Sequence, residues 1–134
     1  MKMDQRAQIS IEYVLFLAMV VVIVSLFGVY VSDQSELNSV SAAVKLGAEN
    51  ATTNMVITNS GMAPVRVTSI NETANGTNEN LTVMFSNTLT SDLQKQIINS
   101  TIQSLIKGGY NNITNTTSSI NLITKRHNYT ITMG

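Results

Sequence analysis

The hydrophobic pattern divides the chain into a front part and a rear part. From Tyr13 to Val31 no residue is charged, and apolar side chains occupy nearly every position. In a helix these residues would extend about 28 Å, which is enough to cross the hydrocarbon core of a membrane. Lys2 and Arg6 precede this run and Asp33 follows it, so the positive-inside rule predicts a cytoplasmic N-terminus and an extracytoplasmic rear part.

After the apolar run the pattern stays helical, but its apolar face narrows. Leu37, Val40 and Val44 recur at positions i, i+3 and i+7 with mostly polar residues between them. We therefore predict one helix over residues 8–49, apolar on all sides in its front half and amphipathic in its back half. The amphipathic half is expected to pack against the rest of the chain. Gly28 allows two interpretations, a close contact between helices or a glycine that the helix tolerates.

Beyond residue 50 the pattern changes to the alternation typical of strands. The expected strands are residues 55–58, 64–68, 81–85, 111–115, 120–124 and 129–133, with a turn at Asn59-Ser60-Gly61. One helix is expected between a cap at Ser91-Asp92 and a stop at Gly108-Gly109. The predicted fold class is α+β: a long N-terminal helix followed by a small antiparallel β-rich head with one helix, residues 50–134.

Composition narrows the possible functions. The chain has 134 residues, of which 8 are basic, 8 are acidic and 12% in total are charged. This balance offers no broad basic surface, so nucleic-acid binding is not predicted. There is no cysteine, which excludes disulfides and thiolate metal sites.

The residues just before the apolar run are unexpectedly polar. Gln8, Ser10 and Glu12 are separated only by single isoleucines. A secretory signal peptide would need small residues after its apolar core, where residues 29–31 are Val-Tyr-Val. A plain single-pass anchor fits the apolar run but leaves the three polar residues unexplained.

The sequence Gln8-Ile9-Ser10-Ile11-Glu12, followed by the apolar run, resembles the start of archaeal type IV prepilins with class III signal peptides. Their pattern is Q-x-S-x-E-x-x-x-L, and this chain has Phe16 in place of the leucine. The resemblance implies a leader of residues 1–7, cut by a prepilin peptidase between Ala7 and Gln8. The apolar helix would then stay on the mature protein.

The same resemblance implies a structural function. The precursor would wait in the cell membrane, and the mature chain would polymerise with copies of itself into an extracellular filament, a pilus used for adhesion. A minor pilin that starts or tips such a filament would carry the same motif. The alternative is a single-pass membrane-anchored protein whose extracytoplasmic head binds a partner without polymerising.

Glu12 has a physical interpretation of its own. It lies just outside the apolar run, where a carboxylate can stay hydrated at the membrane surface. A cut before Gln8 would create an ammonium group four residues away, and the two charges could pair within or between subunits and set their register. Glu12 is therefore predicted to be an assembly residue. The alternative is a glutamate that only stabilises the start of a helix.

The rear part is rich in potential N-glycosylation sites. Chance would give about four sites of the N-x-[ST] type among its asparagines. The chain has eight, all with threonine in the third position: Asn50, Asn71, Asn75, Asn80, Asn99, Asn112, Asn115 and Asn128. None precedes Asn50, which agrees with export of the rear part and with an oligosaccharyltransferase as a partner. The alternative is an Asn/Thr-rich β surface whose sites arise by accident.

Residues typical of catalysis are scattered. The single histidine, His127, is expected to be a solvated residue of a turn before the last strand, because the sequence indicates no partner for a role as a metal ligand or a catalytic base. The carboxylates of the head do not form a calcium-binding loop, and no nucleotide or nucleophile motif is present. We therefore predict no enzymatic activity, no catalytic residue, no cofactor and no metal site.

Overall fold

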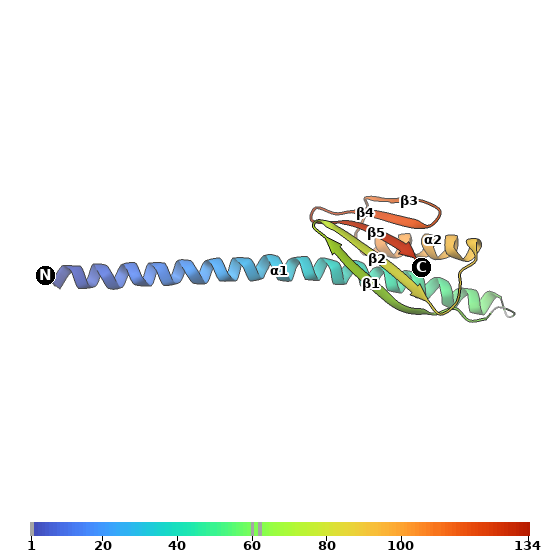
Figure 1. The fold of residues 1–134 in the computed structure, drawn as a ribbon, viewed down its shortest axis with the longest axis horizontal. Coiled ribbons are helices and arrows are strands. Elements are labelled where there is room, and N and C mark those ends of the chain that lie inside the picture. Colours follow the sequence, from blue (N-terminus) through green and yellow to red (C-terminus); the bar gives the residue numbers. More distant parts are fainter. Residues whose placement is uncertain (1, 60, 62) are drawn as a thin grey trace. The chain divides into compact units, whose positions relative to one another are not determined.

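The computed structural model describes residues 2–59, 61 and 63–134, with side chains described from Gln8 onward. The elements are α1 (Lys2–Thr58), β1 (Val67–Asn75), β2 (Asn78–Phe85), α2 (Ser91–Lys107), β3 (Ile113–Asn115), β4 (Ser119–Ile123) and β5 (Asn128–Met133) (Figure 1). The predicted α+β class is confirmed. The chain divides into two compact units, Met1–Glu36 and Leu37–Gly134, called here the front unit and the head unit.

In the front unit, the apolar part of α1 is exposed along its described length. Every described side chain from Gln8 to Val31 is exposed; Leu26, for example, is 67% exposed. The helix is long and apolar enough to cross a membrane, and none of its most apolar window is buried. The predicted membrane-spanning capacity of this segment is therefore present, by length and composition.

The head unit contains a five-stranded sheet in the order β1-β2-β5-β4-β3. β1 and β2 form an antiparallel hairpin, and Gly76 in its turn has a φ of 65°, a value that glycine adopts without strain. β4 pairs antiparallel with both β3 and β5. β2 and β5 are parallel, so the expectation of a wholly antiparallel sheet is wrong at this pair. α2, β3 and β4 lie between them in sequence, and such a long connection permits parallel pairing.

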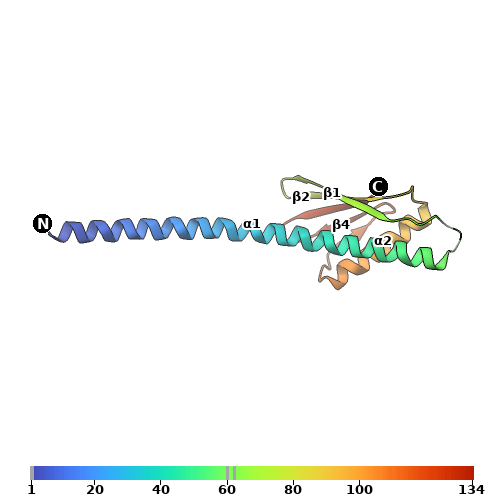
Figure 2. The same cartoon turned by 90° about the horizontal axis from the view of Figure 1, so that it is seen from below.

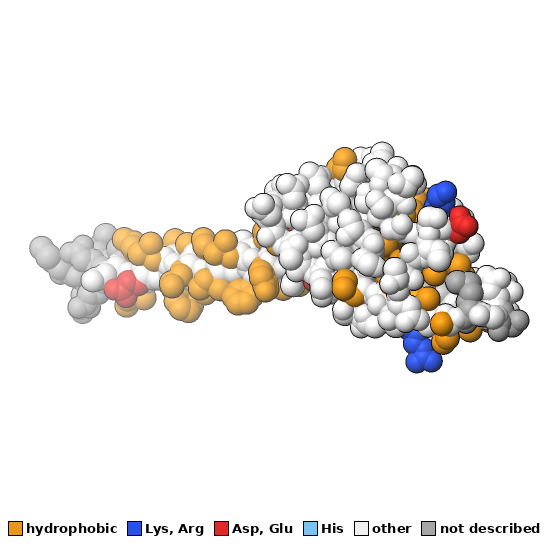
Figure 3. Space-filling model, turned by 45° about the vertical axis from the view of Figure 1, so that its right-hand side comes forward, with side chains coloured by type: hydrophobic (Ala, Val, Ile, Leu, Met, Phe, Trp, Pro, Cys, Tyr) orange, Lys and Arg blue, Asp and Glu red, His pale blue; other side chains and the backbone are white. Residues whose placement is uncertain are grey.

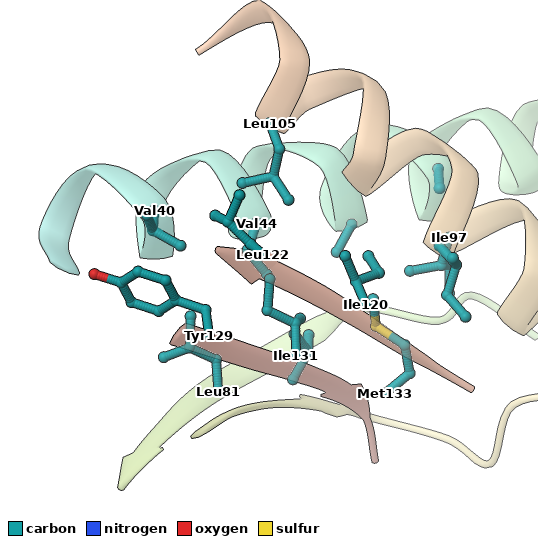
Figure 4. Packing of buried hydrophobic residues seen from close by; sticks show 14 of the residues in the cluster. Val40, Val44, Leu81, Ile97, Leu105, Ile120, Leu122, Tyr129, Ile131 and Met133 are labelled. Carbon is teal, nitrogen blue, oxygen red and sulfur yellow. The ribbon is translucent and has the colours of Figure 1, made fainter. Parts of the chain in front are cut away.

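One face of this sheet packs on two helices, the back part of α1 and α2, which lie side by side (Figures 1 and 2). The two-layer core is drawn in Figure 4. Its largest fully buried side chains come from both helices and the central strands: Val40, Val44, Leu81, Val83, Leu93, Ile97, Ile98, Leu105, Ile120, Leu122, Tyr129 and Ile131. The amphipathic stripe of the back half therefore packs as predicted.

Helix α1 continues well beyond its predicted end at residue 49. It reaches Thr58, so the strand expected at residues 55–58 is wrong. The reason is the core: Val44, Ala48, Ala51 and Met55 follow one helical face and are all buried. Their burial outweighs the β preference of the β-branched residues at 56–58. The expected turn that follows includes Ser60, which lies outside the described residues.

The other expected elements are present with shifted ends. β1 begins at Val67, so only the end of the strand expected at residues 64–68 forms. α2 is capped by Thr90, one residue before the predicted cap. The Thr90 hydroxyl accepts a hydrogen bond from the Leu93 amide at 3.4 Å. Gly108 ends the helix and Gly109 follows with a φ of 95°. The four strands from β2 to β5 lie within three residues of their predicted bounds.

The two helices of the head unit meet at Gly47. A Cβ atom at this position would lie 2.5 Å from the Thr101 Cα, so only glycine fits without a shift of the backbone. Two serines of α2 reinforce the contact. Ser100 Oγ donates to the Gly47 carbonyl at 2.8 Å, and Ser104 Oγ donates to the Ala43 carbonyl at 2.7 Å.

Candidate functional surfaces

The predicted processing motif lies on α1, at the first residues whose side chains are described. Gln8, Ser10 and Glu12 are all exposed. Gln8 and Glu12 are one helical turn apart on the same face, about 6 Å along the axis. A new amino group at Gln8 would thus be created within reach of the Glu12 carboxylate. Ala7, on the other side of the predicted cut, has a side chain outside the described set.

The apolar surface of the front unit is continuous. Hydrophobic side chains follow one another along this part of α1, whereas the visible face of the head unit is mostly uncharged and polar (Figure 3). The hydroxyl of Ser25 donates to the Val21 carbonyl at 2.7 Å, so this polar group is satisfied inside the helix. A Cβ atom at Gly28 would meet nothing within 4 Å, so both interpretations of this glycine remain open.

All eight predicted glycosylation sites present their asparagine to solvent. The exposed residues are Asn50, Asn71, Asn75, Asn80, Asn99, Asn112, Asn115 and Asn128. Asn50 lies on α1 and Asn99 on α2, and the other six lie on or beside the strands. Accessibility of the asparagine is a condition for a glycan, and it leaves the prediction of modification itself untested.

The threonines of these sites differ more than the asparagines. Thr52 is 5% exposed and Thr101 is fully buried, and both belong to the helical sites. The threonines of the other six sites are exposed or half-buried. Sequence reasoning treated the eight sites as equivalent. The strand or helix context of each site was the signal that could have separated them.

The head unit also contains a shallow groove of about 440 Å³ between the last turns of α1 and the start of β1. Val56, Ile57 and Val67 line it together with the charged side chains of Glu49 and Arg66. Ile57 is 74% exposed, which makes it one of the most exposed apolar residues of this unit. The groove was not predicted from the sequence.

His127 lies where it was predicted, in the turn between β4 and β5. Its ring packs against Tyr129 with centroids 5.9 Å apart, and its backbone amide donates to Thr124 Oγ1 at 3.0 Å. The carboxylate of Glu72 accepts a hydrogen bond from Ser41 at 2.7 Å. Among the described residues, no group of three or more His, Asp and Glu side chains is close enough to hold a metal ion.

No protein-family model, curated protein or solved structure matches this chain. The function is therefore argued from the two units themselves.

Proposed function

We propose that the chain is a type IV pilin-like subunit of an archaeal surface filament. It is made as a membrane precursor, cut between Ala7 and Gln8 by a prepilin peptidase, and polymerised through the front part of α1. The observation that carries this proposal is the exposed apolar surface of residues 13–31, beside a head unit with a core of its own. A helix that is apolar on all sides needs lipid or other helices around it.

The apolar surface of the front unit would be covered first by lipid and later by other subunits. In the precursor, lipid covers the apolar segment, which is long enough to cross the membrane. In the filament, the same side chains of neighbouring subunits cover one another, and the membrane-spanning helix becomes part of a helical core. The head unit needs no refolding in this transfer, since its core is made by residues from 37 onward.

Glu12 sets the register of the helices in the filament core. A carboxylate at the centre of a membrane helix costs about 2.5–3.5 kcal/mol on insertion scales, and its place before the apolar segment avoids most of this cost. Once it is surrounded by other helices, the carboxylate needs a cationic partner. The ammonium group that the cut creates at Gln8 is that partner, and a mispaired register would leave both charges buried alone.

The first test is the mass and N-terminal residue of the protein recovered from filaments sheared from the cell surface. We expect an N-terminus at Gln8, because the cut must precede release from the membrane. Retention of Met1 or Lys2, or a chain found in membranes and never in filaments, would contradict the proposal. The amount per filament separates a main subunit from a minor pilin.

A second test isolates the charge of Glu12. Glu12→Gln keeps the size of the side chain and removes its charge, so processing should continue while the amount of filament falls at least tenfold. Asp92→Asn is the matched control, since Asp92 is an exposed carboxylate on α2. Filaments of the Glu12→Gln variant in normal amount would exclude the assembly role.

A membrane-anchored protein that never polymerises is the second candidate. The groove that contains Ile57 and Arg66 favours it, because an exposed apolar side chain beside a charge is suited to a protein partner. Gln8→Leu distinguishes the candidates. A pilin precursor should keep its leader and gain the mass of residues 1–7 relative to the mature protein, whereas a plain anchor should have the same N-terminus in both variants.

A further inference from the structure

We propose that N-glycans are attached to the six sites on or beside the strands of the head unit and that the two helical sites stay unmodified. The modified set is Asn71, Asn75, Asn80, Asn112, Asn115 and Asn128, and the unmodified set is Asn50 and Asn99. The inference rests on the export that the proposed function includes. It does not depend on polymerisation.

Strand and helical sites differ because the asparagine and the threonine of an Asn-x-Thr site are two residues apart. In a strand, residues i and i+2 point to the same face, so the asparagine and threonine of one site lie side by side. In a helix, two residues correspond to about 200° of rotation, so they lie on opposite sides. The pairs Asn128–Thr130 and Asn80–Thr82 follow the first rule, because both side chains of each pair are on the outer face of the sheet; the asparagines are exposed and the threonines half-buried.

The helical sites follow the second rule, and their threonines belong to the core. Thr101 is fully buried and its hydroxyl donates to the Ile97 carbonyl at 2.7 Å. Thr52 is 5% exposed and its hydroxyl donates to the Glu49 carbonyl at 3.0 Å. An enzyme selective for Asn-x-Thr must recognise the hydroxyl as well as the amide. In the folded helices only the amide can be reached.

The outer face of the sheet has the opposite character. One row across all five strands consists of Thr73, Asn80, Thr130, Asn121 and Thr114, which are neighbours in the strand pairing. No charged side chain lies on this face among the described strands. Asparagine is depleted in strands, so its repetition on this face calls for another reason than β propensity.

Glycans here would serve a physical purpose. β1 is an edge strand of nine residues, and the flat face beside it has no charge to prevent association between sheets. Asn71 lies within this edge strand and Asn75 at its end. Glycans at these two positions would prevent another sheet from pairing with the edge of β1. In other proteins charged side chains on an edge strand have this effect.

The test is site-resolved mass spectrometry of the protein from the total membrane and filament fractions. Cleavage after lysine and arginine places Asn50 alone in the peptide 46–66 and Asn99 alone in the peptide 96–107. The other sites fall in the peptides 67–95, 108–125 and 127–134. We expect added sugar mass on these three peptides and none on the first two.

Matched substitutions make the same comparison on the intact chain. Asn80→Gln should lower the mass by one glycan, whereas Asn99→Gln should lower it by nothing beyond the change of residue. Similar occupancy of helical and strand sites would overturn the inference, because it would mean that acceptors are chosen before the helices fold. Absence of sugar from the strand peptides would overturn it as well.

The outcome is independent of the filament test. A chain with its leader uncut that carries sugar only on the strand peptides would support this inference and contradict the proposed function. A chain cut at Gln8 with no sugar at all would do the reverse.

Discussion

The front and back parts of α1 contain similar apolar residues, but these are exposed in the front part and, along one face, buried in the back part. Val24 is 63% exposed in the front part, and Val44 is completely buried in the back part. The difference lies in their surroundings: the sheet and α2 cover one face of the back part, whereas the described side chains of residues 8–31 in the front part are all exposed. Apolar residues on one stripe can be satisfied by the chain's own fold, whereas apolar residues on every side require a partner from outside.

This comparison separates the residues that stabilise the fold from those proposed to act in assembly. Burial of a Val, Leu or Ile side chain contributes about 1.5–3 kcal/mol, so the buried stripe stabilises the head unit. The exposed apolar residues of the front unit gain nothing comparable until lipid or another subunit covers them. Substitutions in the two parts should therefore change different measurements.

The largest expected effect comes from an isoleucine pair. Ile97 is fully buried on α2 and Ile23 is exposed on the front part of α1. Ile97→Ala should lower the free energy of unfolding by about 2–5 kcal/mol, since it removes core contacts and leaves a cavity. Ile23→Ala should leave it unchanged. Thermal unfolding of the full chain in detergent, followed by the near-ultraviolet dichroism of buried Tyr129, measures both.

Equal losses in the two isoleucine variants would mean that the front unit is part of the same cooperative core, and the comparison would fail. If only Ile97→Ala unfolds early, the yield of filaments from Ile23→Ala shows whether the front surface works in assembly.

Substitutions of two glycines, one in each part of α1, should change stability by an intermediate amount. Gly47→Ala should destabilise the head by about 1–3 kcal/mol, because the new Cβ would collide with the backbone of α2 at Thr101. Gly28→Ala meets nothing within 4 Å and should stabilise the helix by up to about 1 kcal/mol through propensity alone. Chemical unfolding in detergent measures the first change, and helicity measures the second.

The glycine pair also decides between the two interpretations of Gly28. Reduced filament yield from Gly28→Ala, with full stability of the monomer, would indicate a close contact between subunits. Normal yield would indicate a tolerated glycine. A Gly47→Ala variant as stable as the parent chain would show that α1 and α2 do not meet as closely as described.

The smallest expected effect comes from a serine pair. Ser104→Ala removes a hydrogen bond between α2 and the Ala43 carbonyl of α1 and should cost about 0.5–1.5 kcal/mol. Ser25→Ala removes a bond within one helix, to Val21, and should change the stability of the head by nothing measurable. The same unfolding experiment compares them. Indistinguishable results would mean that apolar packing alone holds the two helices together.

Much of the candidate site was predictable from local sequence. The charge-free segment after Glu12 is visible in the order of residues, since a membrane-spanning helix is a local property. The alternation in residues 81–85 and 129–133 predicted β2 and β5, because one face of each strand packs on the core. The assembly role of Glu12 stays a prediction, as it concerns other copies of the chain.

The missed features depend on contacts between distant residues. Gly47 is the point where α2 packs on α1 through Ser100, and this contact joins residues that are far apart in sequence. The eight glycosylation sites look alike in sequence, yet Thr52 and Thr101 are in the core because of where the helices lie. No local pattern contains that information.

The sequence by itself determined most of the helical and extended segments and which of them require an apolar environment. These properties depend on the 3.6- and 2-residue periods and on the absence of charge over a stretch of chain. Only the tertiary structure decided that α1 continues to Thr58, that β2 pairs parallel with β5, and which acceptor threonines are buried. The physical reason is that burial depends on neighbours far away in sequence, and it can outweigh the local preference of a residue for strand or helix.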